Sequence, residues 1–179
     1  MSAIVPLGFD YGDISGAPYI TKPMTIKSRK KRIGLRWQGS TQFEHEHHKA
    51  FPYELMFAAV KDADAEFISL QRDEGADAAP GWVKQVKLDT WEDTRRAVAS
   101  CDLVISSCTS VSHLSAAMGI KTLVVTPIMP YFLYALAGES TPYYKSMSLI
   151  RQEVFGDWQA PFDQIKDRLG ESPLLRSVA

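Results

Sequence analysis

Two short runs of uninterrupted apolar residues constrain the fold more than any other feature of this sequence. Leu103-Val104-Ile105 and Leu123-Val124-Val125 show no alternation of polar and apolar side chains. A strand with one solvated face alternates, so these runs are typical of strands that are buried on both faces. Such strands belong to parallel sheets covered by helices. The sequence therefore predicts an α/β domain with a mostly parallel sheet.

Predicted strands and helices alternate along the chain. The strands span residues 33–37, 66–70, 83–88, 102–106, 122–126 and 147–150, with a loop at 73–81, and the helices span 51–60, 90–100, 110–118 and 157–170. Thr90 and Asp93 form a capping box, Gly119 and Gly170 are typical of the residue that follows a helix, and Asp157 caps the last helix. This order predicts a Rossmann-like, doubly wound sheet of about six strands.

The first 31 residues differ from the rest of the chain, because glycine and proline recur without periodicity. We interpret residues 1–31 as an arm or linker, residues 32–172 as the domain, and residues 173–179 as a tail. The arm ends in a basic run at residues 27–32. We read this run as solvated; a nucleic-acid patch is the alternative, but no aromatic platform accompanies it.

The composition and charge argue against a nucleic-acid-binding protein and a membrane-spanning protein. Hydrophobic residues make up 45% of the 179 residues and the net charge is −1, so no global field attracts nucleic acid. No apolar run has the length of a membrane span, and residues 1–10 lack the features of a signal peptide. Cys101 and Cys108 flank a strand, which separates them by about 20 Å. They are predicted to be free thiols, and we expect a soluble cytoplasmic protein.

Ligands of a doubly wound sheet bind beyond the carboxyl ends of the strands, and one segment there is the strongest candidate. Residues 106–113 pass from a buried strand through small hydroxylated residues into a helix, whose free N–H groups can hold a phosphate. Thr109 and Ser110 offer hydroxyl donors, and His113 lies in the first turn. The alternative is an ordinary helix cap with a packed histidine.

Other candidates follow the first two strands. Gly39 and Ser40 follow the first strand, where a glycine permits close approach of a ligand or forms a simple turn. Gln71 follows the second strand. Lys49 precedes the first helix and could pair with a diphosphate. Neither a Walker lysine nor a GxGxxG fingerprint is present.

A histidine-rich segment and a cysteine are two further features that could form chemical sites. Residues 44–49 hold three histidines and two glutamates, but zinc ligands usually come from two separated segments, so we expect a polar loop and no metal. Cys108 precedes a helix, where its pKa could be lowered. Only His113 could serve it as a base, so we do not expect a cysteine nucleophile.

Segments spread over nearly the whole chain carry a resemblance to a known family: residues 18–20, 33–40, 67–71, 102–119, 143–144, 151–152 and 156–158. The chain resembles the C-terminal half of the glycosyltransferases of family nine, the ADP-heptose:LPS heptosyltransferase type. The likeness is strongest to the version found behind tetratricopeptide repeats in bacterial proteins.

The resemblance implies a GT-B fold of two Rossmann-like domains, of which the C-terminal one holds a nucleoside diphosphate sugar. The donor pocket that it implies consists of Gly39, Ser40, Lys49, Gln71, Cys108, Thr109, Ser110 and His113. Lys49 stands where the family often has an arginine, and Cys108 where it usually has an aspartate. No cofactor and no metal are expected.

The resemblance covers only the second domain, and the first one carries the acceptor site and usually the catalytic base. We therefore assign no catalytic residue, and we expect sugar transfer only with a partner chain, as a homodimer or within a longer protein. The alternative is a non-catalytic nucleotide- or saccharide-binding module, or a scaffolding subunit. Tyr131, Phe132 and Tyr134 could form a docking surface or could pack in the core.

Overall fold

The structure is a computed structural model that describes residues 7–23, 30–42, 46–72, 74–134 and 137–171. Within these residues, a six-stranded sheet has the order β3-β2-β1-β4-β5-β6, and every neighbouring pair is parallel. The strands are β1 (Arg32–Arg36), β2 (Glu66–Ser69), β3 (Val83–Lys84), β4 (Leu103–Ser107), β5 (Lys121–Thr126) and β6 (Met147–Arg151). The predicted parallel, Rossmann-like sheet is confirmed.

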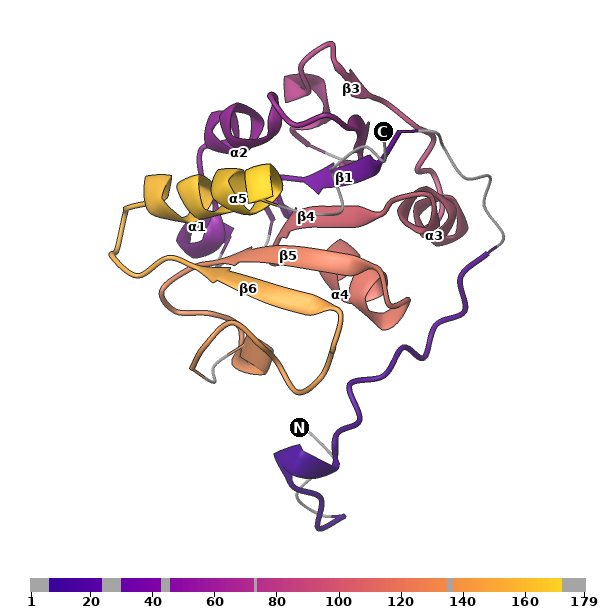
Figure 1. Ribbon diagram of the computed structural model, residues 1–179, viewed down its shortest axis with the longest axis vertical. Helices are drawn as coiled ribbons and strands as arrows, with labels where there is room; N and C mark the ends of the chain where they lie inside the picture. Colours follow the sequence, from indigo (N-terminus) through magenta and orange to yellow (C-terminus); the bar gives the residue numbers. More distant parts are fainter. Residues whose placement is uncertain (1–6, 24–29, 43–45, 73, 135–136, 172–179) are drawn as a thin grey trace.

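Helices cover both faces of the sheet (Figure 1). α2 (Tyr53–Val60) packs against α5 (Gln159–Glu171) on one face, and α3 (Trp91–Ala99) packs against α4 (Ser110–Ala117) on the other. Short helices complete the chain: α1 (Glu46–Lys49), η1 (Tyr11–Asp13), η2 (Ala76–Ala78) and η3 (Phe132–Tyr134). None of the helices in the described part of the chain combines the length and hydrophobicity needed to cross a bilayer.

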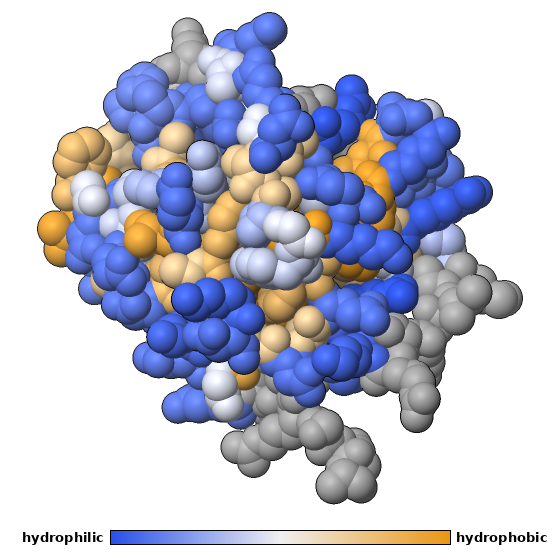
Figure 2. Space-filling view, turned by 90° about the horizontal axis from the view of Figure 1, so that it is seen from above, coloured by the Kyte–Doolittle hydropathy of each residue, from blue (hydrophilic) through white to orange (hydrophobic). Residues whose placement is uncertain are grey.

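The packing of the core explains why the apolar runs in β4 and β5 do not alternate with polar residues. Alternate residues of β4 point to opposite faces, so that Leu103 and Ile105 join the cluster under α2 and α5, while Val104 joins the cluster under α3 and α4. Both faces are therefore covered, as the sequence predicts. On the outer surface seen from above, apolar residues lie in bands between hydrophilic side chains (Figure 2).

The predicted helix ends are confirmed at three positions. Thr90 Oγ1 accepts a hydrogen bond from the Asp93 amide at 3.1 Å, and the Thr90 amide donates to Asp93 Oδ2 at 3.0 Å, which completes the capping box. Gly119 adopts φ 71° directly beyond the end of α4, in the left-handed region that favours glycine. Asp157 Oδ1 accepts from the amides of Gln159 and Ala160 at the start of α5.

Three local predictions are wrong. The third strand ends at Lys84 instead of residue 88: Val83 and Lys84 pair with Phe67 and Ile68 of β2, and Leu88 is buried without extending the sheet. Gly170 does not end the last helix, which continues to Glu171 beyond the buried Leu169. The loop at residues 73–81 contains the short helix η2.

The N-terminal arm contacts the domain through α4 and the loop before β6. The amides of Tyr19 and Ile20 both donate to the carbonyl of Ala117, and the amide of Lys145 donates to the carbonyl of Gly16. Residues 7–15, the described residues before this contact, extend away from the sheet (Figure 1). The described part of the basic run is ion-paired, with Lys30, Lys31 and Arg32 bound to Asp64, Asp102 and Glu66. The predicted tail, residues 173–179, lies outside the described residues.

Candidate functional site

The strand order reverses between β1 and β4, and this position locates the candidate site. After β1 the chain winds outward through β2 and β3, and then crosses to the other side of β1 to form β4, β5 and β6. The crossovers above β1 and β4 lead in opposite directions, which opens a crevice beyond their carboxyl ends. Gly39 follows β1 and Cys108 follows β4, so the topology brings these two predicted residues to the same crevice.

Gly39 is buried, and its neighbour in space is the carboxylate of Glu46. The Gly39 amide donates to Glu46 Oε1 at 2.8 Å. A Cβ atom at Gly39 would lie 2.5 Å from Glu46 Oε2 and 2.7 Å from Oε1. The glycine predicted to permit close approach does so, but the group that approaches is an internal carboxylate.

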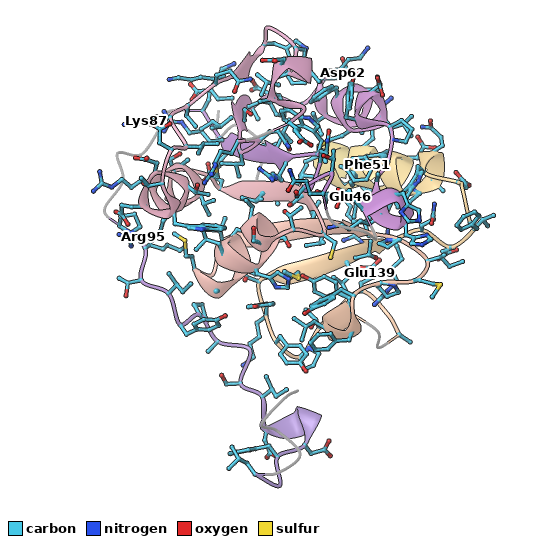
Figure 3. All side chains as sticks on the ribbon, turned by 180° about the vertical axis from the view of Figure 1, so that it is seen from behind. Glu46, Phe51, Asp62, Lys87, Arg95 and Glu139 are labelled. Carbon is cyan, nitrogen blue, oxygen red and sulfur yellow. The ribbon has the colours of Figure 1, made fainter. Side chains whose placement is uncertain are left out.

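Lys49 spans the crevice. Its Nζ donates to the carbonyl oxygen of Cys108 at 3.1 Å and forms an ion pair with Glu46 Oε2 at 2.8 Å. The side chains of Lys49 and Glu46 are only 17% and 9% exposed, so this pair is largely desolvated. Lys49 therefore joins the segment after β1 to the end of β4, and its position beside the crevice agrees with the predicted one. Figure 3 shows Glu46 on α1, next to the ends of the central strands.

The N-terminus of α4 faces the same crevice and is not capped by a side chain. Thr109 occupies the cap position in an extended conformation, but its side chain accepts no hydrogen bond from the helix. Its Oγ1 instead lies 3.3 Å from Ser106 Oγ, in the interior. Ser110 is exposed at the first helical position. The Ser112 amide donates to the Thr109 carbonyl at 3.0 Å, so the amides of Ser110 and Val111 are the ones left to a ligand or to water.

The interior beneath this turn also holds an unsatisfied hydroxyl. Ser107 Oγ, at the end of β4, is buried and has no hydrogen-bond partner among the described residues. Buried hydroxyls are usually satisfied, and exceptions are frequent at functional sites. The Ser107 hydroxyl and the uncapped first turn of α4 therefore place hydrogen-bonding groups that the described residues leave unused at the end of β4.

Cys108 is not an activated thiol. Burial raises the pKa of the Cys108 thiol, since desolvation of the thiolate outweighs the attraction of Lys49. The idea that the helix end lowers this pKa is therefore wrong. Cys101 is also buried, and burial raises its pKa to about 12. Both cysteines are free thiols, as predicted from their separation.

His113 lies among aromatic rings on α4. Its ring is nearly parallel to that of Tyr134, with 5.6 Å between the centroids and 11° between the planes. The Tyr134 hydroxyl lies within hydrogen-bond distance of both ring nitrogens, 3.2 Å from Nε2 and 3.4 Å from Nδ1. Burial lowers the pKa of His113, which keeps the ring neutral at pH 7.

Two residues predicted for the donor pocket, Gln71 and Ser40, form hydrogen bonds within the chain instead of facing an open position. Gln71 is buried, accepts from the Gln38 amide at 3.1 Å and donates to the Glu74 carbonyl at 2.8 Å. It therefore joins the loops after β1 and β2. Ser40 is exposed, and its Oγ accepts from the Gln42 amide in a local turn.

Sequence reasoning missed two charged residues at this edge. Arg36 is the last residue of β1 and is only 7% exposed; one guanidinium nitrogen donates to the Leu70 carbonyl at 3.2 Å. The sequence signal for the burial of Arg36 is its position between the apolar residues Leu35 and Trp37. Glu46 is 7% exposed, although it lies within a run of polar residues that we expected to form a loop. Residues 46–49 form α1 instead, because Glu46 is drawn inward by Gly39 and Lys49.

The histidine-rich segment does not assemble a metal site in the described residues, where no group of three potential ligands converges. His47 and His48 are exposed, with ring centroids 3.8 Å apart. Glu44 and His45 lie outside the described residues. The aromatic segment after β5 is divided: Tyr134 is buried in the core, whereas Tyr131 and Phe132 are 50% and 62% exposed.

Two cavities differ in their relation to this site. A cavity of about 290 Å³ borders the crevice and is lined by Trp37, Gln38, Thr41, Glu46, His47, Ala50, Phe51 and Tyr53. A larger one of about 520 Å³ lies at the opposite edge, beside the first residues of β4 and β5. We favour the smaller one, since parallel sheets bind ligands at the carboxyl edge.

Comparisons with known proteins identify the fold. No protein-family model matches the sequence, and no curated protein matches it. The chain is similar to the solved structure of E. coli ADP-heptose LPS heptosyltransferase II, with a TM-score of 0.53 and 14% identity over 84% of this chain and 48% of that chain. It also matches the glycosyltransferase SnogD from Streptomyces nogalater, with a TM-score of 0.40 and 17% identity over 88% of this chain and 45% of that one.

At 14% identity, the likeness to the heptosyltransferase shows a shared fold. The chain spans about half the length of the two solved structures that it matches. The arrangement of its strands and helices is thus similar to that of about half of the heptosyltransferase structure.

Proposed function

We propose that this chain is a nucleoside-diphosphate-sugar-binding domain of a heptosyltransferase-like glycosyltransferase of GT-B architecture. One observation carries the proposal: the uncapped N-terminus of α4 and the ammonium group of Lys49 meet at the carboxyl edge where the strand order reverses. A free helix N-terminus and a lysine are the groups that bind a phosphate without a metal. The fold shared with a heptosyltransferase supports this choice of ligand.

The reaction would transfer the sugar from the diphosphate to an acceptor hydroxyl. The bond between the anomeric carbon and the diphosphate oxygen breaks, and the acceptor oxygen forms the new bond while a base removes its proton. The amides of α4 and Lys49 would stabilise the charge that develops on the departing diphosphate. His113, being neutral, would contribute a hydrogen bond and no charge.

The base and the acceptor site belong, in this proposal, to another domain or partner chain. A general base must reach the acceptor hydroxyl within about 3 Å, and we assign that role to no residue here. The exposed rings of Tyr131 and Phe132 lie beyond β5 at the same edge and would suit a contact with that partner.

A second candidate function is a non-catalytic nucleotide- or saccharide-binding module. The observation that favours it is the ion pair between Lys49 and Glu46, since a carboxylate already neutralises the lysine that a diphosphate needs. In this case the domain binds a ligand, or acts as a scaffold, without transferring sugar.

Saturation-transfer NMR tests the first candidate. The chain is mixed with ADP, UDP, GDP and their sugar conjugates at millimolar concentration. We expect transfer to one nucleotide series, and we expect Lys49→Met to weaken it while Lys61→Met, an exposed lysine after α2, does not. Absence of transfer to every nucleotide would refute the proposal, whereas transfer to free saccharides alone would favour the second candidate.

A further inference from the structure

Glu46 is the most deeply buried acidic side chain at the candidate site, and both of its oxygens meet groups that would otherwise bind an anion. Oε1 accepts from the Gly39 amide at 2.8 Å, and Oε2 lies 2.8 Å from Lys49 Nζ. The contact of Oε2 is an ion pair without a hydrogen bond among the described residues, but an N–H group and an ammonium group that converge on one carboxylate are the groups that bind an anion. The anion that fills this site is part of the chain.

We propose that Glu46 is an internal anion that occupies the phosphate position beside Gly39 and Lys49, and that it determines which ligands this part of the site accepts. A diphosphate binds there only when the Glu46 carboxylate has withdrawn, whereas an uncharged group can bind beside it. This inference rests on the proposed function for the identity of the natural ligand, but the position it describes is defined by Gly39, Glu46 and Lys49 alone.

The packing around Gly39 supports this assignment. The space that a Cβ would fill at Gly39 contains three atoms of the Glu46 carboxylate group, at 2.5, 2.7 and 2.9 Å. The backbone of Gly39 does not have positive φ, so the turn itself does not require glycine. The close approach of the carboxylate therefore accounts for the glycine without any ligand.

The electrostatics give the direction of the effect. Lys49 carries one positive charge, and its carbonyl partner, Cys108, adds none. With Glu46 present, the pair is neutral, and an entering phosphate would meet a carboxylate within a few ångströms in a poorly solvated crevice. Without the carboxylate, Lys49 loses its ion pair with Glu46 and the Gly39 amide loses its acceptor, so both groups attract a phosphate more strongly.

The test uses inorganic pyrophosphate as a probe, so that it does not depend on the base or sugar of the natural ligand. Pyrophosphate is titrated into the ¹⁵N-labelled chain, and the Gly39 amide shift is followed in wild type, Glu46→Gln and Glu46→Ala. We expect both variants to bind pyrophosphate at least about tenfold more tightly than the wild type. Glu54→Gln on the exposed side of α2 makes the same charge change away from the site, and we expect it to match the wild type.

Adding Lys49→Met to Glu46→Gln should abolish the gain, since the freed ammonium group causes it. Glu46→Gln preserves the shape of the side chain, and thermal unfolding verifies that each variant is folded. If wild type and both Glu46 variants have equal affinities, or if all fail to bind pyrophosphate, the inference is wrong. If the variants bind pyrophosphate but no nucleotide binds any form of the chain, the inference stands and the proposed function fails.

Discussion

Replacement of Gly39 by alanine tests whether the buried carboxylate of Glu46 fixes the loop after β1. The added methyl group would overlap the carboxylate at 2.5 Å, and the polar contacts of Glu46 with Gly39 and Lys49 hold that carboxylate in place. Because Gly39 does not have positive φ, alanine fits the backbone. The cost therefore comes from moving Glu46.

The magnitude follows from the contacts that are lost. A hydrogen bond to a charged acceptor contributes about 1.5–3 kcal/mol, and separating a buried ion pair costs on the order of 3–5 kcal/mol when one charge is left alone. The pair at Glu46 and Lys49 retains some exposure, so we take the lower part of that range. Alanine returns about 0.4–1 kcal/mol by restricting the unfolded chain. The expected destabilisation is about 3.5–5.5 kcal/mol, a decrease in Tm of about 7–22 °C for a chain of this size.

Urea denaturation of wild type, Gly39→Ala, Glu46→Ala and the double variant forms a double-mutant cycle. In the Glu46→Ala background the methyl group has room, so we expect Gly39→Ala to cost less than about 0.5 kcal/mol there, with a coupling energy above about 1.5 kcal/mol. A cost below about 1 kcal/mol for Gly39→Ala alone, or an equal cost in both backgrounds, would refute the reasoning.

Three further predictions concern the cap, the histidine and the cysteines. Thr90→Ala removes the capping box with Asp93 and should lower the free energy of unfolding by about 1 kcal/mol in urea denaturation; an unchanged value would contradict this role. Burial lowers the pKa of His113, so its NMR titration should fall below that of the unfolded chain, and its contribution to stability, complete above pH 6.5, should be lost as the pH falls from there through the folded pKa; a folded pKa at or above 6.5 would contradict this. Burial raises the pKa values of Cys101 and Cys108, so both thiols should react with a disulfide reagent only on unfolding, and rapid labelling of the native chain would refute their burial.

The fold could be predicted because its signals are local. The apolar runs in β4 and β5, the capping box at Thr90 and Asp93, and Gly119 each act within a few residues, and each is found as predicted. The length of β3 could not be predicted, because the apolar residues Val86 and Leu88 lie beyond Lys84, where the pairing with β2 ends. Gly170 remains helical since the packing of α5 on the sheet outweighs the weak helix propensity of glycine.

The positions of the candidate residues could be predicted where topology determines them, but the burial of individual side chains could not. Ligands of parallel sheets bind beyond the carboxyl ends of the strands, and this rule predicts that Gly39, Lys49 and Thr109 lie at one crevice. The structure places them there. Glu46 was overlooked because a polar run has no periodicity that distinguishes an inward glutamate from an outward one. The pKa of Cys108 was misjudged for a similar reason, since its burial depends on side chains distant in sequence.

The central position of β1 has a consequence for how the chain is made. β1 pairs with β2 and, on its other side, with β4, whose first residue is Leu103. Synthesis at about 5–20 residues per second leaves an interval of several seconds in which β1 has emerged but β4 has not. During that interval one side of β1 presents unpaired N–H and C=O groups, which can pair with a strand of another chain. The nascent protein is therefore exposed to pairing with other chains along β1 until Leu103–Ser107 closes the middle of the sheet.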